Sequence, residues 1–482
     1  MVVSDSVKNL SLYEQLAAEI SQQIEEGVLK PGDRLLSVRR MGEKKHYSPT
    51  TVVQAYALLE DQGKIEARPQ SGYYVSKQLL PESVCVEPKT SADLLDPQTV
   101  HNDEIIWKIT QNASNANLLQ FGAALPAPDL LPVERLNRIL ARIVRSGQVP
   151  YESYGFPQGM PELRAQIARR AYSIGAAVSS EDIVITTGCN EAIHLALLAV
   201  CRPGDLVAIE TPCYFGILLQ LEALGLSALE IPSHPRDGIS LEALGFAIEH
   251  YPVRAVITVP NFSNPLGSLM SDERKQALVD LLALFEIPLI EDDIYGELAF
   301  SGRRPSIAKA YDRNDLVILC SSFSKDVSPS LRVGWMMPGR FRDKVLKTKL
   351  PLNIATPILP QMVVSEYLEN GGYDHHLRSI RRVYAQKVGY MSQAVLDHFP
   401  DGTRVSTPQG GFVLWVQLPG DVDALELYRR SLSFGITIAP GHIFSTTQRY
   451  RNFIRLNAAY MDFKGERAIA QLGGQVREMM NA

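Results

Sequence analysis

The chain has 482 residues, of which 45% are apolar and 21% are charged, so it is long enough for two or three globular domains and is not depleted of core-forming residues. A net charge of −5 excludes a uniformly basic nucleic-acid-binding protein, and the five scattered cysteines lack the paired spacing of a metal site. No stretch reaches about 18 apolar residues and the N-terminus has no apolar signal core, which predicts a soluble cytoplasmic protein without disulfides, metal or membrane contact.

Residues 1–78 predict a small domain of three helices and a hairpin. Ser11 and Glu14 form a capping box ahead of a first helix. A second short helix is expected near Ser37, and Ser48 caps a third helix whose first position is occupied by Pro49. The stretch "KIEARPQSGYYVS" alternates around a Pro-Gln-Ser-Gly turn. The expected apolar stripes comprise Leu12, Leu16, Ile20 and Ile24 in the first helix and Val52, Tyr56 and Leu59 in the third. This pattern is typical of a winged helix-turn-helix.

Charge is distributed unevenly over this small domain. Ten Lys and Arg balance ten Asp and Glu up to Lys77, but residues 30–50 hold six cations against two acids. The first helix holds four glutamates and no cation. Such polarity on a winged helix predicts a face that binds the phosphates of double-stranded DNA.

Residues 79–117 are rich in acids and prolines and predict an interdomain linker. From residue 118 to 482, apolar β-branched runs alternate with helical segments. This alternation predicts an α/β domain with a mainly parallel sheet covered by helices on both faces. We expect a large subdomain over about residues 150–350 and a smaller α+β subdomain over about 360–482.

Polar residues follow five of the predicted strands, where ligands bind in such sheets. Gly188 precedes a predicted helix, whose free N–H groups can bind an anion. An apolar strand ends at Asp292, and a lysine follows another predicted strand in "SSFSKDVSPSLRVGW". Each feature alone has an ordinary structural explanation, such as a solvated loop, a core tyrosine or an aspartate paired with an arginine. Together they predict a site for pyridoxal 5′-phosphate, with the lysine for an imine and the carboxylate for the ring nitrogen. The residues expected to contact this cofactor are Gly188, Cys189, Asn190, Tyr214, Asn264, Asp292, Tyr295, Ser322, Lys325 and Arg332.

A second motif fits the same lysine locally. Ser322 and Lys325 match the S-x-x-K of penicillin-recognising serine enzymes. No S-D-N follows, and the parallel α/β pattern disagrees with that fold, so the cofactor site is the favoured interpretation.

From about Leu118 onward the sequence resembles a fold-type I aminotransferase. The motifs that carry the resemblance are "YGFPQGMPELR", "TTGCNEAI", "NFSNPLG", "EDDIYGEL", "SSFSKDVSPSLRVGW", "TPQGGFVLW" and "NFIRLNAAY". The resemblance implies Lys325 as the aldimine lysine and proton shuttle, Asp292 on the pyridine nitrogen, and Asn264 and Tyr295 near the ring oxygen. It also implies that Arg455 clamps a substrate carboxylate. Two further residues are singled out: Tyr154 would reach the cofactor phosphate of a second subunit in a homodimer, and Cys189 stands where serine or alanine is usual.

The N-terminal domain resembles the GntR-type winged helix, which reads L-P-S-x-R and then V-S-R-x-T-V. Here the corresponding stretches are "LLSVR" and "YSPTTVVQAY", with Pro49 and Val53 as departures that thin the direct base readout. The resemblance implies DNA contacts from Arg34, Ser37, Arg39, Thr50, Thr51, Gln54 and Gly72. A GntR-type reader linked to an aminotransferase-like domain is similar to the MocR family of bacterial regulators.

The favoured function is a transcriptional regulator that senses pyridoxal phosphate, or an amino compound through aldimine formation at Lys325. The alternative is a working aminotransferase with a DNA-binding appendage, because Lys325, Asp292 and Arg455 are all present. A third possibility is a DNA-bending module joined to an aminotransferase-like domain that no longer binds the cofactor. The presence of Lys325 disfavours it, because such a domain would not need this lysine. The residues alone do not identify the amino compound, the operator or the sign of regulation.

Overall fold

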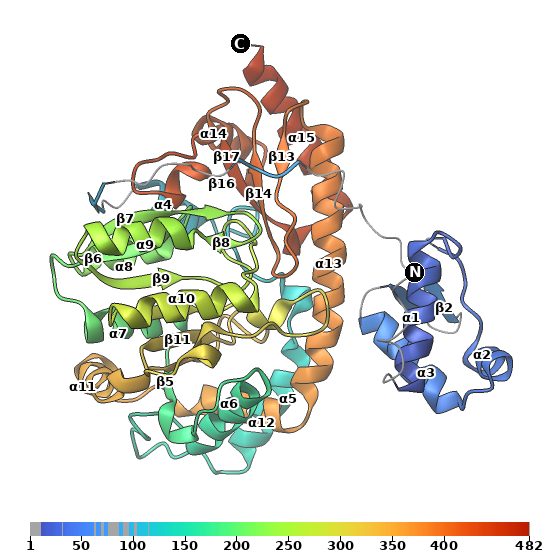
Figure 1. The fold of residues 1–482 in the computed structure, drawn as a ribbon, viewed down its shortest axis with the longest axis horizontal. Coiled ribbons are helices and arrows are strands. Elements are labelled where there is room, and N and C mark those ends of the chain that lie inside the picture. Colours follow the sequence, from blue (N-terminus) through green and yellow to red (C-terminus); the bar gives the residue numbers. More distant parts are fainter. Residues whose placement is uncertain are drawn as a thin grey trace. The chain divides into compact units, whose positions relative to one another are not determined.

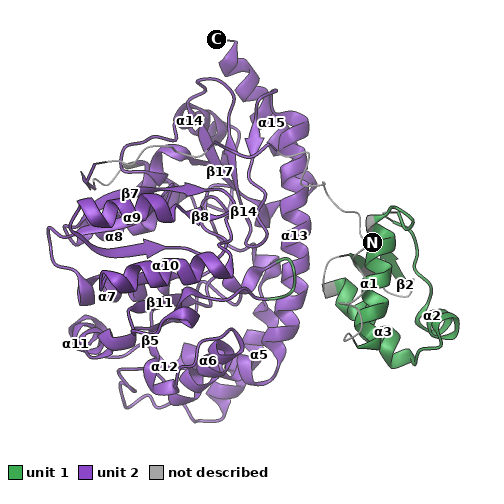
Figure 2. Ribbon diagram, viewed as in Figure 1, with its two compact units in different colours: residues 1–84, 300–303 green, residues 85–299, 304–482 purple. Residues whose placement is uncertain are grey.

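The computed structural model describes residues 11–30, 32–61, 64–68, 72–75, 86–89, 96–100, 104–113 and 115–481 (Figure 1). The chain divides into two compact units, residues 1–84 with 300–303 and residues 85–299 with 304–482 (Figure 2). Each unit is described by itself below.

The first unit has the predicted three helices and hairpin. Its elements are α1 (Leu12–Glu25), α2 (Val38–Lys45), α3 (Pro49–Asp61), β1 (Ile65–Arg68) and β2 (Gly72–Val75). The capping box is present at Ser11, whose backbone N–H donates to Glu14 Oε2 at 2.8 Å. Ser48 Oγ accepts the N–H of Thr51 at 3.1 Å at the start of α3. The predicted turn at residues 69–71 and Gly63, the expected end of the third helix, lie outside the described residues.

The core of the first unit joins all three helices to the hairpin. Val52, Tyr56 and Leu59 are fully buried, as the stripe of α3 predicts. Leu16 and Ile20 from α1 lie in the same cluster. The burial expected for Leu12 is wrong: this side chain, at the first position of α1, is 53% exposed.

The second unit is built on a nine-stranded sheet with the order β3-β7-β6-β9-β10-β11-β12-β5, and β8 pairs with β7. The pairs from β7 to β11 are parallel, whereas β12 is antiparallel to both its neighbours. The strands are β3 (Gln98–Thr99), β5 (Val184–Thr186), β6 (Leu206–Thr211), β7 (Ser227–His234), β8 (Gly238–Ile239), β9 (Val253–Thr258), β10 (Leu289–Asp292), β11 (Val317–Ser322) and β12 (Gly334–Met337). The predicted, mainly parallel sheet is confirmed.

Helices cover both faces of this sheet (Figure 1). Along β6, Val207 and Ile209 face the cluster that contains α7, whereas Leu206 and Ala208 face the cluster that contains α9 and α10. Burial on both faces explains why the strands read as continuous apolar runs. The covering helices are α7 (Cys189–Val200), α8 (Phe215–Ala223), α9 (Leu241–His250), α10 (Asp272–Leu284) and α11 (Arg342–Asn353).

A smaller α+β part follows, with an antiparallel sheet of order β13-β14-β17-β16. Its strands are β13 (Arg404–Val405), β14 (Val413–Gln417), β16 (Ala439–Pro440) and β17 (Phe453–Asn457), and β4 (Leu119–Gln120) pairs in parallel with β15 (Ile436–Thr437). The remaining helices are α5 (Val133–Arg145), α6 (Pro161–Ser173), α12 (Ile358–Glu369), α13 (Gly372–His398), α14 (Ala424–Ser433) and α15 (Phe463–Met480).

The stretch expected to be a linker, residues 79–117, contains two elements of the second unit. Strand β3 pairs with β7 at the edge of the large sheet, and α4 (Glu104–Asn112) buries Ile106 and Ile109 while Trp107 stays 66% exposed. The boundaries at residues 78 and 117 remain predictions. Among the described residues, no helix combines the length and apolar character needed to cross a membrane.

Candidate cofactor and DNA-binding sites

One cavity of about 390 Å³ lies in the second unit where β10 and β11 end. This volume is within the range of small-molecule sites, roughly 300–1,000 Å³. Nine of the ten residues predicted to contact a cofactor line it, together with the predicted substrate arginine: Cys189, Asn190, Tyr214, Asn264, Asp292, Tyr295, Ser322, Lys325, Arg332 and Arg455. The structure therefore gathers groups from five strand ends and from the smaller sheet.

Gly188, the tenth predicted contact, is the N-cap of α7 at one end of the cavity. Its φ of 89° and ψ of 172° belong to a region that only glycine adopts readily. A Cβ at this position would lie 2.9 Å from Arg332 Cζ, closer than real Cβ atoms approach their neighbours. The N–H groups at the start of α7 and the Arg332 guanidinium thus lie close together, with no room for a side chain at position 188. Such a pairing of helix N-terminus and cation is suited to bind an anion.

Lys325 extends into the cavity from the turn after β11. Its Nζ donates to the carbonyl of Ala124 at 2.6 Å and lies 5.7 Å from the ring centroid of Tyr295. Burial, together with the nearby positive charge of Arg455, lowers the pKa of this amine to about 8. A much larger fraction of Lys325 is therefore the neutral, nucleophilic amine at neutral pH than for an ordinary lysine.

Asp292 ends β10 and is 4% exposed. Cys189 Sγ donates to its Oδ1 at 3.4 Å, and the N–H of Ile294 donates to the same oxygen at 3.2 Å. Burial raises the pKa of Asp292 to about 6, and the Cys189 hydrogen bond opposes that rise. At neutral pH the carboxylate is mostly ionised, so it suits a protonated ring nitrogen.

Arg455 reaches the cavity from β17, a strand of the smaller sheet. Its Nη1 donates to Asn264 Oδ1 at 3.0 Å, and its Nη2 donates to the carbonyl of Gly122. The side chain is 1% exposed, and its Nε has no hydrogen-bond partner among the described residues. A buried guanidinium whose Nε–H has no partner is suited to bind a carboxylate.

The two predicted aromatic contacts are held differently. Tyr214 begins α8, where Gly216 leaves room for its ring, because a Cβ on that glycine would lie 2.8 Å from the Tyr214 hydroxyl. Tyr295 is 2% exposed and packs edge-on against Phe412 at 5.5 Å between centroids. Burial raises the pKa of both phenols, so each stays a hydroxyl donor at neutral pH.

Several lining residues come from segments that were not predicted to take part. Ile109, Thr110 and Ala113 belong to α4 or follow it directly, and residues 123–125 precede the large sheet. Phe215 also lines the cavity. The only signal for the 123–125 segment was the stretch "LPAPDLLP", whose first residue is Leu125; the contribution of α4 left no local pattern.

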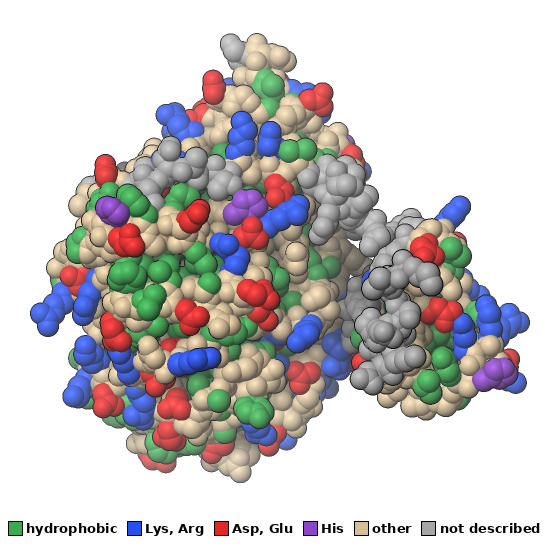
Figure 3. Space-filling view, viewed as in Figure 1, with side chains coloured by type: hydrophobic (Ala, Val, Ile, Leu, Met, Phe, Trp, Pro, Cys, Tyr) green, Lys and Arg blue, Asp and Glu red, His purple; other side chains and the backbone are tan. Residues whose placement is uncertain are grey.

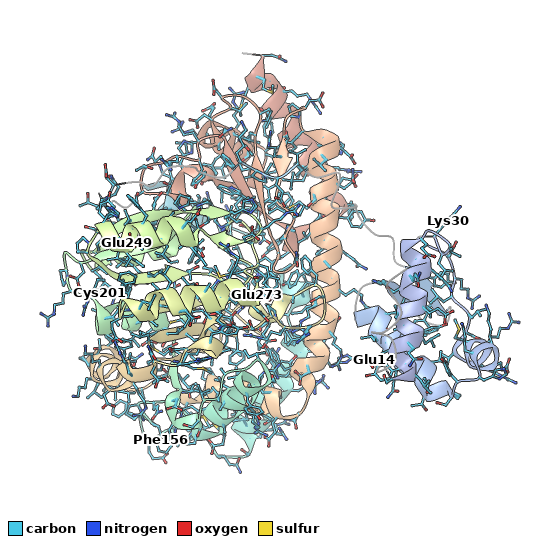
Figure 4. The ribbon with its side chains drawn as sticks, in the orientation of Figure 1. Glu14, Lys30, Phe156, Cys201, Glu249 and Glu273 are labelled. Carbon is cyan, nitrogen blue, oxygen red and sulfur yellow. The ribbon has the colours of Figure 1, made fainter. Side chains whose placement is uncertain are left out.

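Tyr154, predicted to serve a second subunit, does not line the cavity of its own chain. It is 77% exposed, and its neighbours Tyr151 and Phe156 are 77% and 61% exposed. Figure 4 shows Phe156 at the edge of the second unit. Three exposed aromatic side chains therefore lie close together in the sequence.

In the first unit, the predicted DNA contacts lie on α2, α3 and β2 and on the segment before α2, which holds Arg34 and Ser37. Thr50 and Gln54 lie one turn apart on α3 and both are exposed. The Thr51 hydroxyl lies 2.8 Å from Ser48 Oγ, and Ser37 Oγ accepts the N–H of Arg40 at 3.4 Å, so these two hydroxyls stabilise helix starts. The departure at Val53 leaves a 46% exposed apolar side chain beside Gln54.

The predicted arginines of the first unit are exposed. Arg39 pairs with Glu43 at 3.1 Å, with the Arg39 side chain 90% exposed. Arg34 is bridged to Tyr74 through the backbone, and a Cβ on Gly72 would lie 3.5 Å from its guanidinium. Figure 3 shows basic side chains gathered on the side that carries α2, and Figure 4 shows Glu14 and Lys30 toward opposite ends of α1. This distribution retains the charge polarity read from the sequence.

Comparison with known proteins identifies both units. The profile "Aminotransferase class I and II" matches residues 127–470, and "Bacterial regulatory proteins, gntR family" matches residues 12–75. The HTH-type transcriptional regulator YdcR of Escherichia coli K12 is 39% identical, over 97% of this chain and 99% of its own. The regulator YjiR of the same organism is 35% identical, over 98% of this chain and 100% of its own. Among solved structures, the chain is similar to LysN, an α-aminoadipate aminotransferase from Thermus thermophilus that is complexed with N-(5′-phosphopyridoxyl)-L-leucine. The TM-score is 0.73 at 29% identity, over 80% of this chain and 96% of LysN.

The fold and these matches define a fusion of a GntR-type winged helix with a class I/II aminotransferase fold. The chain belongs to the MocR-type family of HTH transcriptional regulators. The predicted family, fold class and regulatory function are thereby confirmed.

Proposed function

We propose that this regulator holds pyridoxal 5′-phosphate in the 390 Å³ cavity and uses it to sense an amino compound. The observation that carries the proposal is that one half-buried amine, Lys325, lines the same cavity as the carboxylate of Asp292 and the guanidinium of Arg332. The chemistry of the donors fits the cofactor: Gly188, Ser322 and Arg332 for its phosphate, Asp292 for its ring nitrogen, Asn264 and Tyr295 for its ring oxygen, Tyr214 for its face and Lys325 for its aldehyde. When bound, the cofactor supplies an electron-withdrawing ring for an attached amine.

The chain's own groups would prepare the site before any ligand arrives. Lys325, with its pKa lowered to about 8, offers a neutral amine. Asp292, kept mostly ionised, offers a carboxylate that would keep a ring nitrogen protonated. Arg455 offers its unused Nε–H to the carboxylate of the amino compound. Because Asp292 and Arg455 are buried and Lys325 is half-buried, their interactions with ligand charge are stronger than they would be in water.

A ligand would alter the contacts of the segment between residues 122 and 125. Lys325 Nζ donates to Ala124 O, and Arg455 Nη2 donates to Gly122 O. A compound that takes over the lysine and the arginine competes for both donors. This segment follows α4 in the chain, and α4 follows the DNA-binding unit, so a change here is a route by which ligand binding alters operator affinity.

The winged helix would bind double-stranded DNA through α3, the wing and the basic side of α2. Thr50 and Gln54 are the exposed α3 side chains suited to base edges, and Arg34 and Arg39 are suited to phosphates. Two copies of the chain would bind as a homodimer, with the aromatic surface around Tyr154 covered by the partner. A C2 dimer matches the two-fold symmetry of a palindromic operator.

The test uses the full-length protein and DNA fragments that it selects from a random library. We expect an absorption band from bound pyridoxal phosphate, lost in Lys325→Ala, and an operator affinity that changes when an amino acid perturbs that band. The Lys325→Ala protein should still bind DNA but should not respond to the amino acid. An operator affinity that is equal with and without cofactor and ligand would contradict the proposal.

A second function, transamination, is favoured by the presence of Lys325, Asp292 and Arg455 in one cavity. Formation of a keto acid by the wild type and not by Lys325→Ala would support it. A band that shifts on ligand addition without keto-acid formation would leave sensing as the function.

A further inference from the structure

We infer that the amino compound sensed by this protein is an amino acid with one carboxylate and an uncharged, largely apolar side chain. This inference rests on the proposed function, because it assumes that the cofactor occupies the cavity. It concerns the part of the cavity wall that the cofactor does not use.

The charges that line the cavity are the first argument. Among its described lining residues only four are ionisable at neutral pH: Asp292, Lys325, Arg332 and Arg455. The first three are assigned to the ring nitrogen, the aldehyde and the phosphate. Arg455 is then the single cation left for the ligand among these residues, and its one positive charge matches one carboxylate. A second ligand charge would have no partner on this wall.

The position of the ligand follows from two hydrogen bonds. The ligand's amino group would replace Lys325 Nζ, which lies 2.6 Å from the Ala124 carbonyl. Its carboxylate would lie at Arg455, which donates to the Gly122 carbonyl. Both contacts belong to the same short segment, so the carbon between the amino and carboxylate groups lies beside it. We place the ligand side chain against the neighbouring residues of this segment and against α4, because these residues line the cavity and are not assigned to the cofactor.

The surface there is apolar. Ala123 and Leu125 belong to the segment, Ile109 lines the cavity from α4, and Ala113 lines it directly after that helix. Thr110 supplies the one polar group of this part of α4, and its hydroxyl already donates to the Ile106 carbonyl at 2.8 Å. Among the described lining residues a charged side chain placed here would gain no counter-ion, whereas an aliphatic one would bury apolar area against these residues.

The experiment follows the absorption band of the full-length protein loaded with pyridoxal phosphate during titration with near-isosteric amino acids. Leucine is compared with asparagine and aspartate, and norleucine with lysine. We expect leucine and norleucine to shift the band at concentrations at least about 100-fold lower than aspartate and lysine. Asparagine, polar but uncharged, should fall between them.

Two variants of α4 sharpen the test. Thr110→Arg adds a cation on the wall and should improve binding of aspartate or glutamate relative to leucine by at least about tenfold. Trp107→Arg adds the same charge to the same helix on a side chain that is 66% exposed and does not line the cavity, so it should leave the preference unchanged.

The outcomes separate the two proposals. No cofactor band in the wild type would refute the proposed function itself. A normal band that aspartate or lysine shifts as readily as leucine would overturn the inference alone, including the case in which a partner chain supplies the second charge. A band that no amino acid shifts would also overturn it.

Discussion

Replacing Gly188 by alanine tests whether the N-terminus of α7 is the phosphate end of the cavity. The new Cβ would lie 2.9 Å from Arg332 Cζ, so the guanidinium must move away from the helix N-terminus. Losing a hydrogen bond to a charged group costs about 1.5–3 kcal/mol. Since about 1.4 kcal/mol corresponds to a factor of ten, the dissociation constant for pyridoxal phosphate should rise about 10- to 150-fold.

The same substitution also strains the backbone, because Gly188 has a φ of 89°. A control is Gly204→Ala: Gly204 has a φ of 93°, and a Cβ there would meet nothing within 4 Å. We expect Gly204→Ala to lower the thermal unfolding temperature and leave cofactor affinity unchanged.

Equilibrium titration followed by absorption measures both variants with pyridoxal phosphate and with pyridoxal, which lacks the phosphate. The Gly188→Ala penalty should be several times larger for the phosphorylated compound. Equal penalties for the two compounds, or a Gly188→Ala protein that binds pyridoxal phosphate like the wild type, would refute the phosphate assignment.

Three further predictions concern both units. Because the pKa of Lys325 is lowered to about 8, the fraction of neutral amine increases about tenfold per pH unit below that value. The rate at which the apo protein binds the cofactor should therefore rise from pH 6 to 8 and level off above about 9. Stopped-flow absorption measures this rate, and a rate still rising at pH 10 would contradict the lowered pKa. Leu59→Ala removes a fully buried side chain of the first unit and should destabilise that unit by about 2–5 kcal/mol, which thermal unfolding measures. Gel-shift assays should show that DNA binding is abolished, while the cofactor absorption band persists. Arg39→Ala should weaken operator binding and reduce the slope of log affinity against log salt by about 1, and an unchanged slope would exclude a phosphate contact at Arg39.

The local elements were predictable because their signals lie within a few residues. The capping box at Ser11, the Ser48 cap before Pro49 and the spacing of Val52, Tyr56 and Leu59 each describe one helix turn, and the structure contains them. The burial of Leu12 was predicted wrongly because periodicity alone does not show where the neighbouring helix stops.

The position of the cavity was also predictable in part. Parallel strands end at one edge of a sheet, so the side chains that follow β10 and β11 had to lie near each other. The sequence by itself therefore determined the family, the fold class and the lysine, carboxylate and glycine that point to the cofactor.

Only the tertiary structure decided which distant segments complete the cavity. Arg455, on β17 of the smaller sheet, and Asn264 are 191 residues apart in the sequence, and Arg455 Nη1 lies 3.0 Å from Asn264 Oδ1. Helix α4, read from composition as part of a linker, lines the ligand side of the cavity with Ile109 and Thr110. Neither periodicity nor capping residues predict such a contact, because it depends on how segments distant in the sequence pack against each other. The identity of the wall facing the ligand, and with it the class of ligand we infer, comes from that packing.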